Sequence, residues 1–114
     1  MPSDPAPLKS RRRDPGSLLS SQIESLAGDR ASVTLKRERP WASITFAGTR
    51  HSLAVNWAAG TDPATVENLA EALPAHEFSI PGHFVADILV TEQSKTRLLV
   101  EALSIIDPVD IVSE

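Results

Sequence analysis

The residues of this chain whose side chains could take part in acid–base or metal chemistry are few and widely spaced. There are three histidines, His51, His76 and His83, and there is no cysteine. None of the histidines shows the His-x-x-x-His spacing of a helical zinc motif, and without cysteine a thiolate metal site is excluded. Glycine-rich phosphate loops of the G-x-G-x-x-G or P-loop type are also absent. The sequence therefore predicts neither a bound metal nor a cofactor.

The best candidate for acid–base chemistry is Asp87, which lies in an apolar run four residues after His83. Side chains alternate between the two faces of a strand, so His83 and Asp87 are expected to share one face. A rise of about 3.3 Å per residue separates them by roughly 13 Å, too far for a direct acid–base pair. Asp87 has three possible roles: a base in an apolar setting, an ion-pair partner across a dimer axis, or a partly solvated or salt-bridged residue, which is the interpretation that we favour. In the first case it would line a small-molecule pocket with His83 or His51.

A second candidate combines an aromatic ring with positive charge. Arg37 and Arg39 precede Trp41, and Arg50 is expected near Trp41 across a hairpin. Rings that stack on bases and cations that hold phosphates are typical of single-stranded nucleic-acid sites, so this patch is a candidate ligand or anion site. The alternative is a solvated edge strand, in which the charges and Pro40 prevent pairing with another sheet edge.

Charge is unevenly distributed along the 114 residues, whose net charge is −4. Residues 1–16 are rich in proline and charge, and we interpret them as a disordered basic arm. We interpret its cluster Arg11, Arg12 and Arg13 as part of a solubilising tail. The alternative is a contact with RNA, DNA or an acidic partner, for which this cluster is the best candidate in the chain. The acidic remainder argues against nucleic-acid binding across the folded surface. We predict a single α+β domain over 17–107 and a flexible tail over 108–114.

The apolar pattern predicts two short helices and about five strands. Asp14-Pro15 and Asp62-Pro63 each offer an N-cap followed by proline at the first helical position, and an apolar stripe of helical period follows both. Alternating residues predict strands over 31–38, 41–47 and 51–57, and two long strands within Pro81–Asp107 joined at 93–95. The result is a two-layer α+β sandwich of order α-β-β-β-α-β-β, with both helices on one face of an antiparallel sheet. Residues 41–46 resemble 85–90, through duplication of a helix-plus-hairpin unit or by chance.

Both strands of Pro81–Asp107 are apolar on both faces, whereas a half-exposed antiparallel strand should have one polar face. Two narrow helices can cover only one face of the sheet, so the other face of this hairpin is left uncovered. We expect that face to be an interface, most simply of an isologous homodimer. Its predicted residues are Val85, Leu89, Leu99, Leu103 and Ile105. The alternative is an error in the predicted register, such as a bulge near Gly82 or a helix over 96–103.

These features favour a non-enzymatic protein-binding module, a homodimer that also holds an unidentified protein. The order of elements is similar to that of secretion-chaperone-like α+β proteins. This likeness, of element order without a shared motif, implies a chaperone-like hold on a partner segment. The sequence has no apolar run long enough to span a bilayer, and a cysteine-free chain suits a reducing compartment, so we expect a cytoplasmic protein without a membrane partner. A small-molecule binder or enzyme, and a nucleic-acid contact through the arginine arm, stay open as alternatives.

Overall fold

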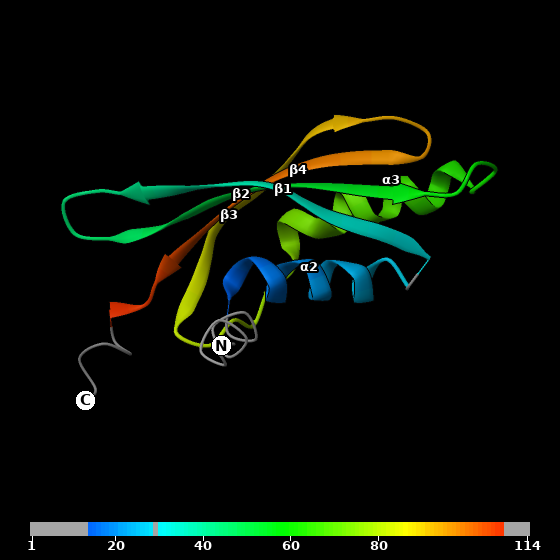
Figure 1. Ribbon diagram of the computed structural model, residues 1–114. Helices are drawn as coiled ribbons and strands as arrows, with labels where there is room; N and C mark the ends of the chain where they lie inside the picture. Colours follow the sequence, from blue (N-terminus) through cyan, green and yellow to red (C-terminus); the bar gives the residue numbers. More distant parts are fainter. Residues whose placement is uncertain (1–13, 29, 109–114) are drawn as a thin grey trace, which may run out of the picture.

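The computed structural model describes residues 14–28 and 30–108, which form a four-stranded antiparallel sheet with two α-helices packed on it (Figure 1). The elements in chain order are α2 (Pro15–Leu26), β1 (Ala31–Ala42), β2 (Ala47–Trp57), α3 (Pro63–Ala72), the 3-10 helix η1 (Leu73–Ala75), β3 (His83–Gln93) and β4 (Arg97–Ile106). The strands lie in the order β1-β2-β4-β3. The predicted α+β class is thereby confirmed. None of the helices in the described residues is long and apolar enough to cross a membrane.

Both α-helices begin at the Asp-Pro pairs found in the sequence. A side-chain oxygen of Asp14 accepts a hydrogen bond from the backbone N–H of Gly16 at 3.4 Å, and Asp62 accepts one from Ala64 at 3.0 Å. The proline that follows each aspartate has no N–H and needs no partner at the first helical position. Helix α2 begins at Pro15, two residues before the start predicted for the domain. It is followed by Gly28, whose φ of 76° suits a residue without a side chain.

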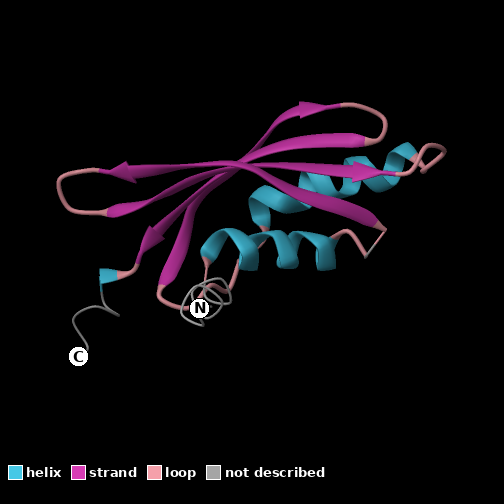
Figure 2. Ribbon diagram, in the orientation of Figure 1, coloured by secondary structure: helices cyan, strands magenta, loops and turns pink. Residues whose placement is uncertain are grey.

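The core lies between the two helices and one face of the sheet. Its buried members are Leu19 and Ile23 of α2, Val66 and Leu69 of α3, Leu73 and Ile80 beyond it, and Leu53, Val55, Trp57, Ile88, Leu98, Val100 and Ala102 of the sheet. Burial of each large apolar side chain stabilises the fold by about 1.5–3 kcal/mol. Figure 2 shows both helices on the same side of the strands, so no described helix covers the other side. We call that uncovered side the open face.

Strand β1 replaces two of the predicted strands. It runs without interruption from Ala31 to Ala42, through Pro40, and residues 43–46 form a turn. Pro40 is paired with Thr49 in the ladder, but β1 lies at the edge of the sheet, where the missing N–H can point away from the neighbouring strand. The sheet therefore has four strands rather than about five, and the order is α-β-β-α-β-β.

Three bulges interrupt the alternation of side chains along the edge strands. They lie between Leu35 and Arg37 in β1, between Val85 and Asp87 in β3, and between Val90 and Glu92 in β3. Each bulge inserts one residue into an edge strand, so the residues after it lie on the face opposite to that expected from strict alternation.

The bulge after Val85 corrects two predictions made from strict alternation. Val85 pairs with Ser104 and packs against the core, so it does not share a face with Leu89 and the other predicted interface residues. His83 pairs with Ile106 on the helix side, whereas Asp87 pairs with Leu103 on the open face. His83 and Asp87 therefore lie on opposite faces of the sheet rather than on the same one.

The chain consists of two successive helix-plus-hairpin units, α2-β1-β2 and α3-β3-β4, whose second strands meet at the centre of the sheet. The two similar segments in the sequence do not occupy equivalent places in these units. Residues 41–46 form the end of β1 and the turn after it, whereas 85–90 lie inside β3. The likeness of the two units is one of element order.

Gly48 lies where the ladder between β2 and β4 begins, and a residue with a side chain does not fit there. A Cβ atom at this position would fall on the backbone carbonyl oxygen of Ser104 and within 3.0 Å of the Cα of Ile105. We therefore expect Gly48→Ala to lower the free energy of unfolding by about 1–3 kcal/mol, as measured by urea denaturation. The control is Ala47→Ser, which also adds one heavy atom but at an exposed position. Equal unfolding midpoints for the two variants would contradict this reading of the close β2–β4 approach.

Candidate protein interface on the open face

The open face presents rows of side chains that lie level with one another across the four strands. Residues paired across neighbouring strands point to the same side of a sheet, so the ladder register defines each row. In the strand order β1, β2, β4, β3, the rows are Trp41, Gly48, Ile105, Phe84; Arg39, Arg50, Leu103, Asp87; Arg37, Ser52, Glu101, Leu89; and Thr34, Ala54, Leu99, Glu92. These rows form the candidate interface.

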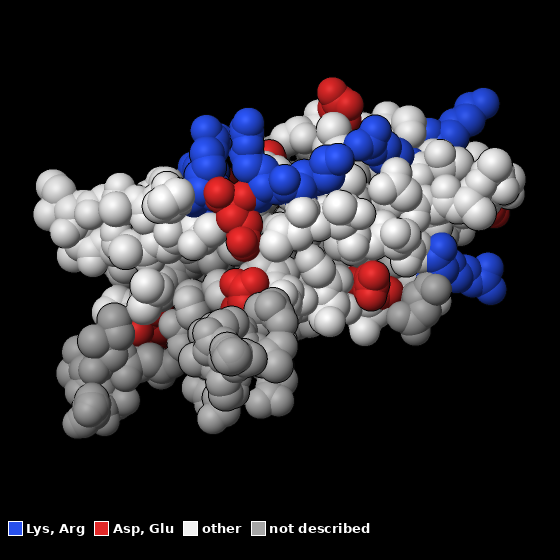
Figure 3. All heavy atoms as spheres, in the orientation of Figure 1, with Lys and Arg blue, Asp and Glu red and all other residues white. Residues whose placement is uncertain are grey.

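Charge is divided across the open face. The arginines Arg37, Arg39 and Arg50 lie on β1 and β2, whereas the carboxylates Asp87, Glu92 and Glu101 lie on β3 and β4. Within the described residues no ion pair joins the two groups. Figure 3 shows many of the Lys and Arg atoms gathered along the strand side of the molecule. The β1–β2 half of the face is therefore basic, and the β3–β4 half is mainly acidic, with Arg97 of β4 at the far end of the β2–β4 ladder as an exception.

The arginine half of the face contains a repulsive contact. Arg39 and Arg50 are direct partners in the β1–β2 ladder, and like charges in this position destabilise a sheet. On the other half, Glu101 accepts a hydrogen bond from the hydroxyl of Ser52 at 2.6 Å, which leaves its charge unneutralised. Among residues 14–28 and 30–108, the charges of both signs on this face thus form no ion pair with one another.

The acidic half of the face also carries bulky apolar side chains. Leu89 and Phe84 on β3 are 42% and 38% exposed. Leu103 and Ile105 on β4 are only 7% and 5% exposed, so little of either side chain is accessible to a partner. Of the predicted interface residues, Leu89 is therefore the most accessible, Leu99 is half-buried and Val85 faces the helices.

The open face continues into an apolar end of the sheet, formed by the β1–β2 turn and the adjoining ends of β3 and β4. We call it the hairpin end. Ile44 in the turn is fully exposed, and Phe46 and Ile106 are each more than one third exposed. The rings of Phe46 and Phe84 meet edge to face with their centroids 6.3 Å apart. A hollow of about 310 Å³ lies beside the turn and Ile106. The hairpin end thus extends the apolar surface of the open face.

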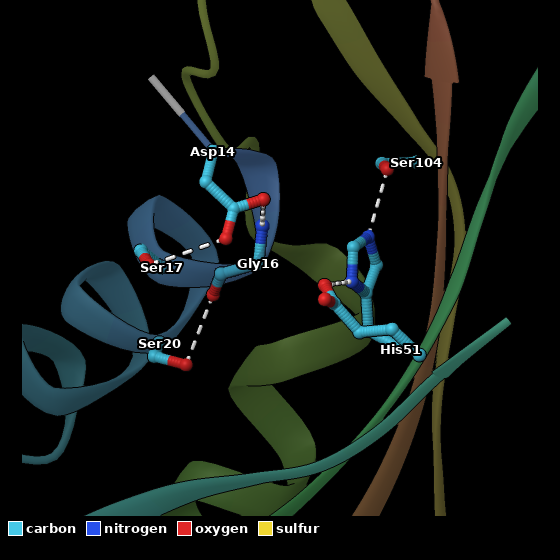
Figure 4. A network of polar contacts seen from close by, with 7 residues as sticks. Asp14, Gly16, Ser17, Ser20, His51 and Ser104 are labelled. Carbon is cyan, nitrogen blue, oxygen red and sulfur yellow. Dashed lines mark hydrogen bonds and ion pairs between the residues drawn. The ribbon is translucent and has the colours of Figure 1, made fainter. Parts of the chain in front are cut away.

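His51, which the sequence suggested as a pocket residue, is completely buried on the helix side of the sheet. Its Nδ1 lies 2.7 Å from Oε2 of Glu38, and its Nε2 lies 2.8 Å from Oγ of Ser104 (Figure 4). The Glu38 carboxylate lies against the start of α2, since a Cβ atom on Gly16 would collide with it. These contacts tie β1, β2 and β4 together beneath the first turn of the helix.

This network has the carboxylate–imidazole–hydroxyl order of a catalytic triad, but its nucleophile is closed off. Ser104 is 1% exposed, so a substrate cannot reach its hydroxyl in this structure. Glu38 and Ser104 were not singled out in the sequence, because their contacts with His51 depend on strand register. Glu38 is the direct ladder partner of His51, which follows only once the bulge after Leu35 is known.

The other predicted chemical residues are not brought together. Nδ1 of His83 lies 2.9 Å from the carbonyl oxygen of Pro81, a local contact on the helix side, whereas Asp87 lies on the open face. In the part of the chain that the structure describes, no three His, Asp or Glu side chains gather as a metal site would require. Trp41 does share the open face with the three arginines. The predicted arm cluster, Arg11, Arg12 and Arg13, lies outside the described residues.

Comparison with protein-family models, with curated proteins and with solved structures finds no match to this chain. No residue role can therefore be carried over from a relative.

The buried histidine network predicts a stability effect. Ser104→Ala would remove the partner of His51 Nε2 and leave this nitrogen unsatisfied in the core. We expect the free energy of unfolding to fall by about 1–3 kcal/mol in urea denaturation followed by tryptophan fluorescence. Ser52→Ala is the matched control, because its hydroxyl also bonds a strand neighbour but is only partly buried. A Ser104→Ala variant as stable as the native chain would contradict a stabilising role for the network.

Proposed function

We propose that this protein is a non-enzymatic protein-binding module that assembles as a homodimer through its open face and acts in the cytoplasm. The observation that carries the proposal is the sheet face that no described helix covers (Figure 2), on which exposed apolar side chains lie beside charges of both signs that form no ion pair among the described residues. A solvated face of an antiparallel sheet is normally polar. Leu89 and Phe84, each more than one third exposed on this face, depart from that pattern.

A second copy of the chain matches the open face in both respects. An isologous interface brings the same patch from each copy together, so apolar side chains meet apolar side chains. A carboxylate of one copy can also neutralise Arg39 of the other, an arginine that lies beside Arg50 within one chain. The hairpin end, with the fully exposed Ile44, offers apolar surface to the further protein that the module would hold.

The alternative functions draw less support from the same residues. A nucleic-acid site on Arg37, Arg39 and Trp41 would have to hold phosphates on a face that also carries Asp87 and Glu92, which repel them. A pocket that uses Asp87, His83 and His51 lacks a common location, because Asp87 lies on the face opposite to the two histidines. Binding of a protein by the open face requires neither that phosphates approach carboxylates nor that residues on opposite faces come together.

Leu89→Arg is expected to break the homodimer. The native chain should scatter light as a species of about twice 12.3 kDa after size exclusion, and the variant as a monomer with native circular dichroism. The reason is that an arginine at this position would replace an apolar contact of the dimer with a charge removed from water. Ala72→Arg, which adds the same charge at an exposed position of α3, should leave the dimer intact.

A native chain that stays monomeric at all accessible concentrations would contradict the proposal. The open face should then be tested with a fluorescent single-stranded oligonucleotide. Binding that weakens steeply with added salt would assign the arginine half of the face to a polyanion instead.

A further inference from the structure

We infer that the two copies in the homodimer are related by a twofold axis parallel to the strands, so that the basic edge of each copy lies over the acidic edge of its partner. This inference rests on the proposed function and specifies its partner surface. It follows from the ladder register and from the division of charge across the open face.

Two twofold axes can bring the open faces of two aligned sheets together. An axis parallel to the strands reverses the strand order of the partner, so that β1 lies over the partner's β3 and β2 over the partner's β4. An axis in the plane of the faces but perpendicular to the strands keeps the order, so that β1 lies over the partner's β1. The second arrangement places Arg37 and Arg39 over the same arginines of the partner, and like charges oppose the interface.

With the axis parallel to the strands, each row of the open face lies over the same row of the partner in the opposite strand order. The β1 residue of a row in one copy therefore faces the β3 residue of that row in the other. Arg39 lies opposite the partner's Asp87, because the two residues occupy the outer positions of one row. In the neighbouring row, Trp41 lies opposite the partner's Phe84, an aromatic pair. Both contacts occur twice in the dimer.

The inner positions of the rows add little to this choice of axis. Ile105 and Ala54 are only 5% and 1% exposed within one chain, so they offer almost no surface to a partner. Arg50 lies opposite the partner's Leu103, and Arg37 lies opposite the partner's Leu89, so Arg39 is the arginine of these rows that meets a carboxylate. The outer pairs, Arg39 with Asp87 and Trp41 with Phe84, therefore select the axis.

Charge reversal in trans tests this pairing. In a homodimer of the Arg39→Glu variant, the new glutamate of each copy lies opposite the partner's Asp87. In a homodimer of the Asp87→Arg variant, the new arginine of each copy lies opposite the partner's Arg39. Each full-length variant alone should therefore dissociate about tenfold or more readily than the native chain in sedimentation experiments. In an equal mixture of the two variants, every reversed charge meets its opposite, so a dimer of near-native affinity should form between them. That restoration would also show that both variants are folded.

The controls are Arg30→Glu and Glu71→Arg, which reverse exposed charges outside the rows and should leave the native dimer unaffected. Variants that dissociate but do not restore a dimer on mixing would overturn the pairing of Arg39 with the partner's Asp87. An Arg39→Glu dimer tighter than the native one would overturn the parallel axis. Both outcomes require a native dimer and so leave the proposed homodimer in place, whereas a monomeric native chain would remove the proposed function itself.

Discussion

The pairing of β2 with β4 is the contact on which the rest of the molecule depends, because it joins two helix-plus-hairpin units into one sheet. The ladder runs from Gly48 paired with Ile105 to Asn56 paired with Arg97. A two-stranded hairpin is marginal in water on its own, and each unit here supplies only one helix. Once the central strands pair, Leu53, Val55, Leu98 and Val100 form a continuous apolar surface that both helices cover. The absence of a side chain at Gly48 lets the strands approach at the end of this ladder.

The same arrangement divides the sheet into two faces with different properties. On the helix side, apolar packing is completed by one polar network, in which Glu38 and Ser104 satisfy both ring nitrogens of the buried His51. On the open face, charges of both signs are left without intramolecular ion pairs among the described residues, next to partly exposed Leu89 and Phe84. Among the described residues, the two α-helices cover one face of the sheet and no helix covers the other (Figure 2). We propose that a partner covers the open face, because its exposed Leu89 and Phe84 lie beside charges of both signs.

The sequence predicts much of the fold because its signals are local. Asp14-Pro15 and Asp62-Pro63 begin both helices, and the apolar stripes that follow supply the buried faces. What could not be predicted depends on contacts between distant strands. The bulge between Val85 and Asp87 reverses the faces of the residues around it, yet nothing in the alternating sequence marks it. Pro40 indicated a break or an edge, and only the sheet order shows that β1 is an edge strand that continues through it. For the same reason the partners of His51 could not be identified without the register.

The most direct test of the dimer arrangement is a set of isotope-filtered nuclear Overhauser measurements on a mixture of labelled and unlabelled full-length chain. With two Trp, three Phe and no Tyr, the aromatic protons of this protein can be assigned individually. The proposed arrangement predicts intermolecular contacts between the indole of Trp41 in one copy and the ring of Phe84 in the other. A dimer that shows intermolecular contacts only from the helices, or no contact from either ring, would contradict the claim that a second copy covers the open face.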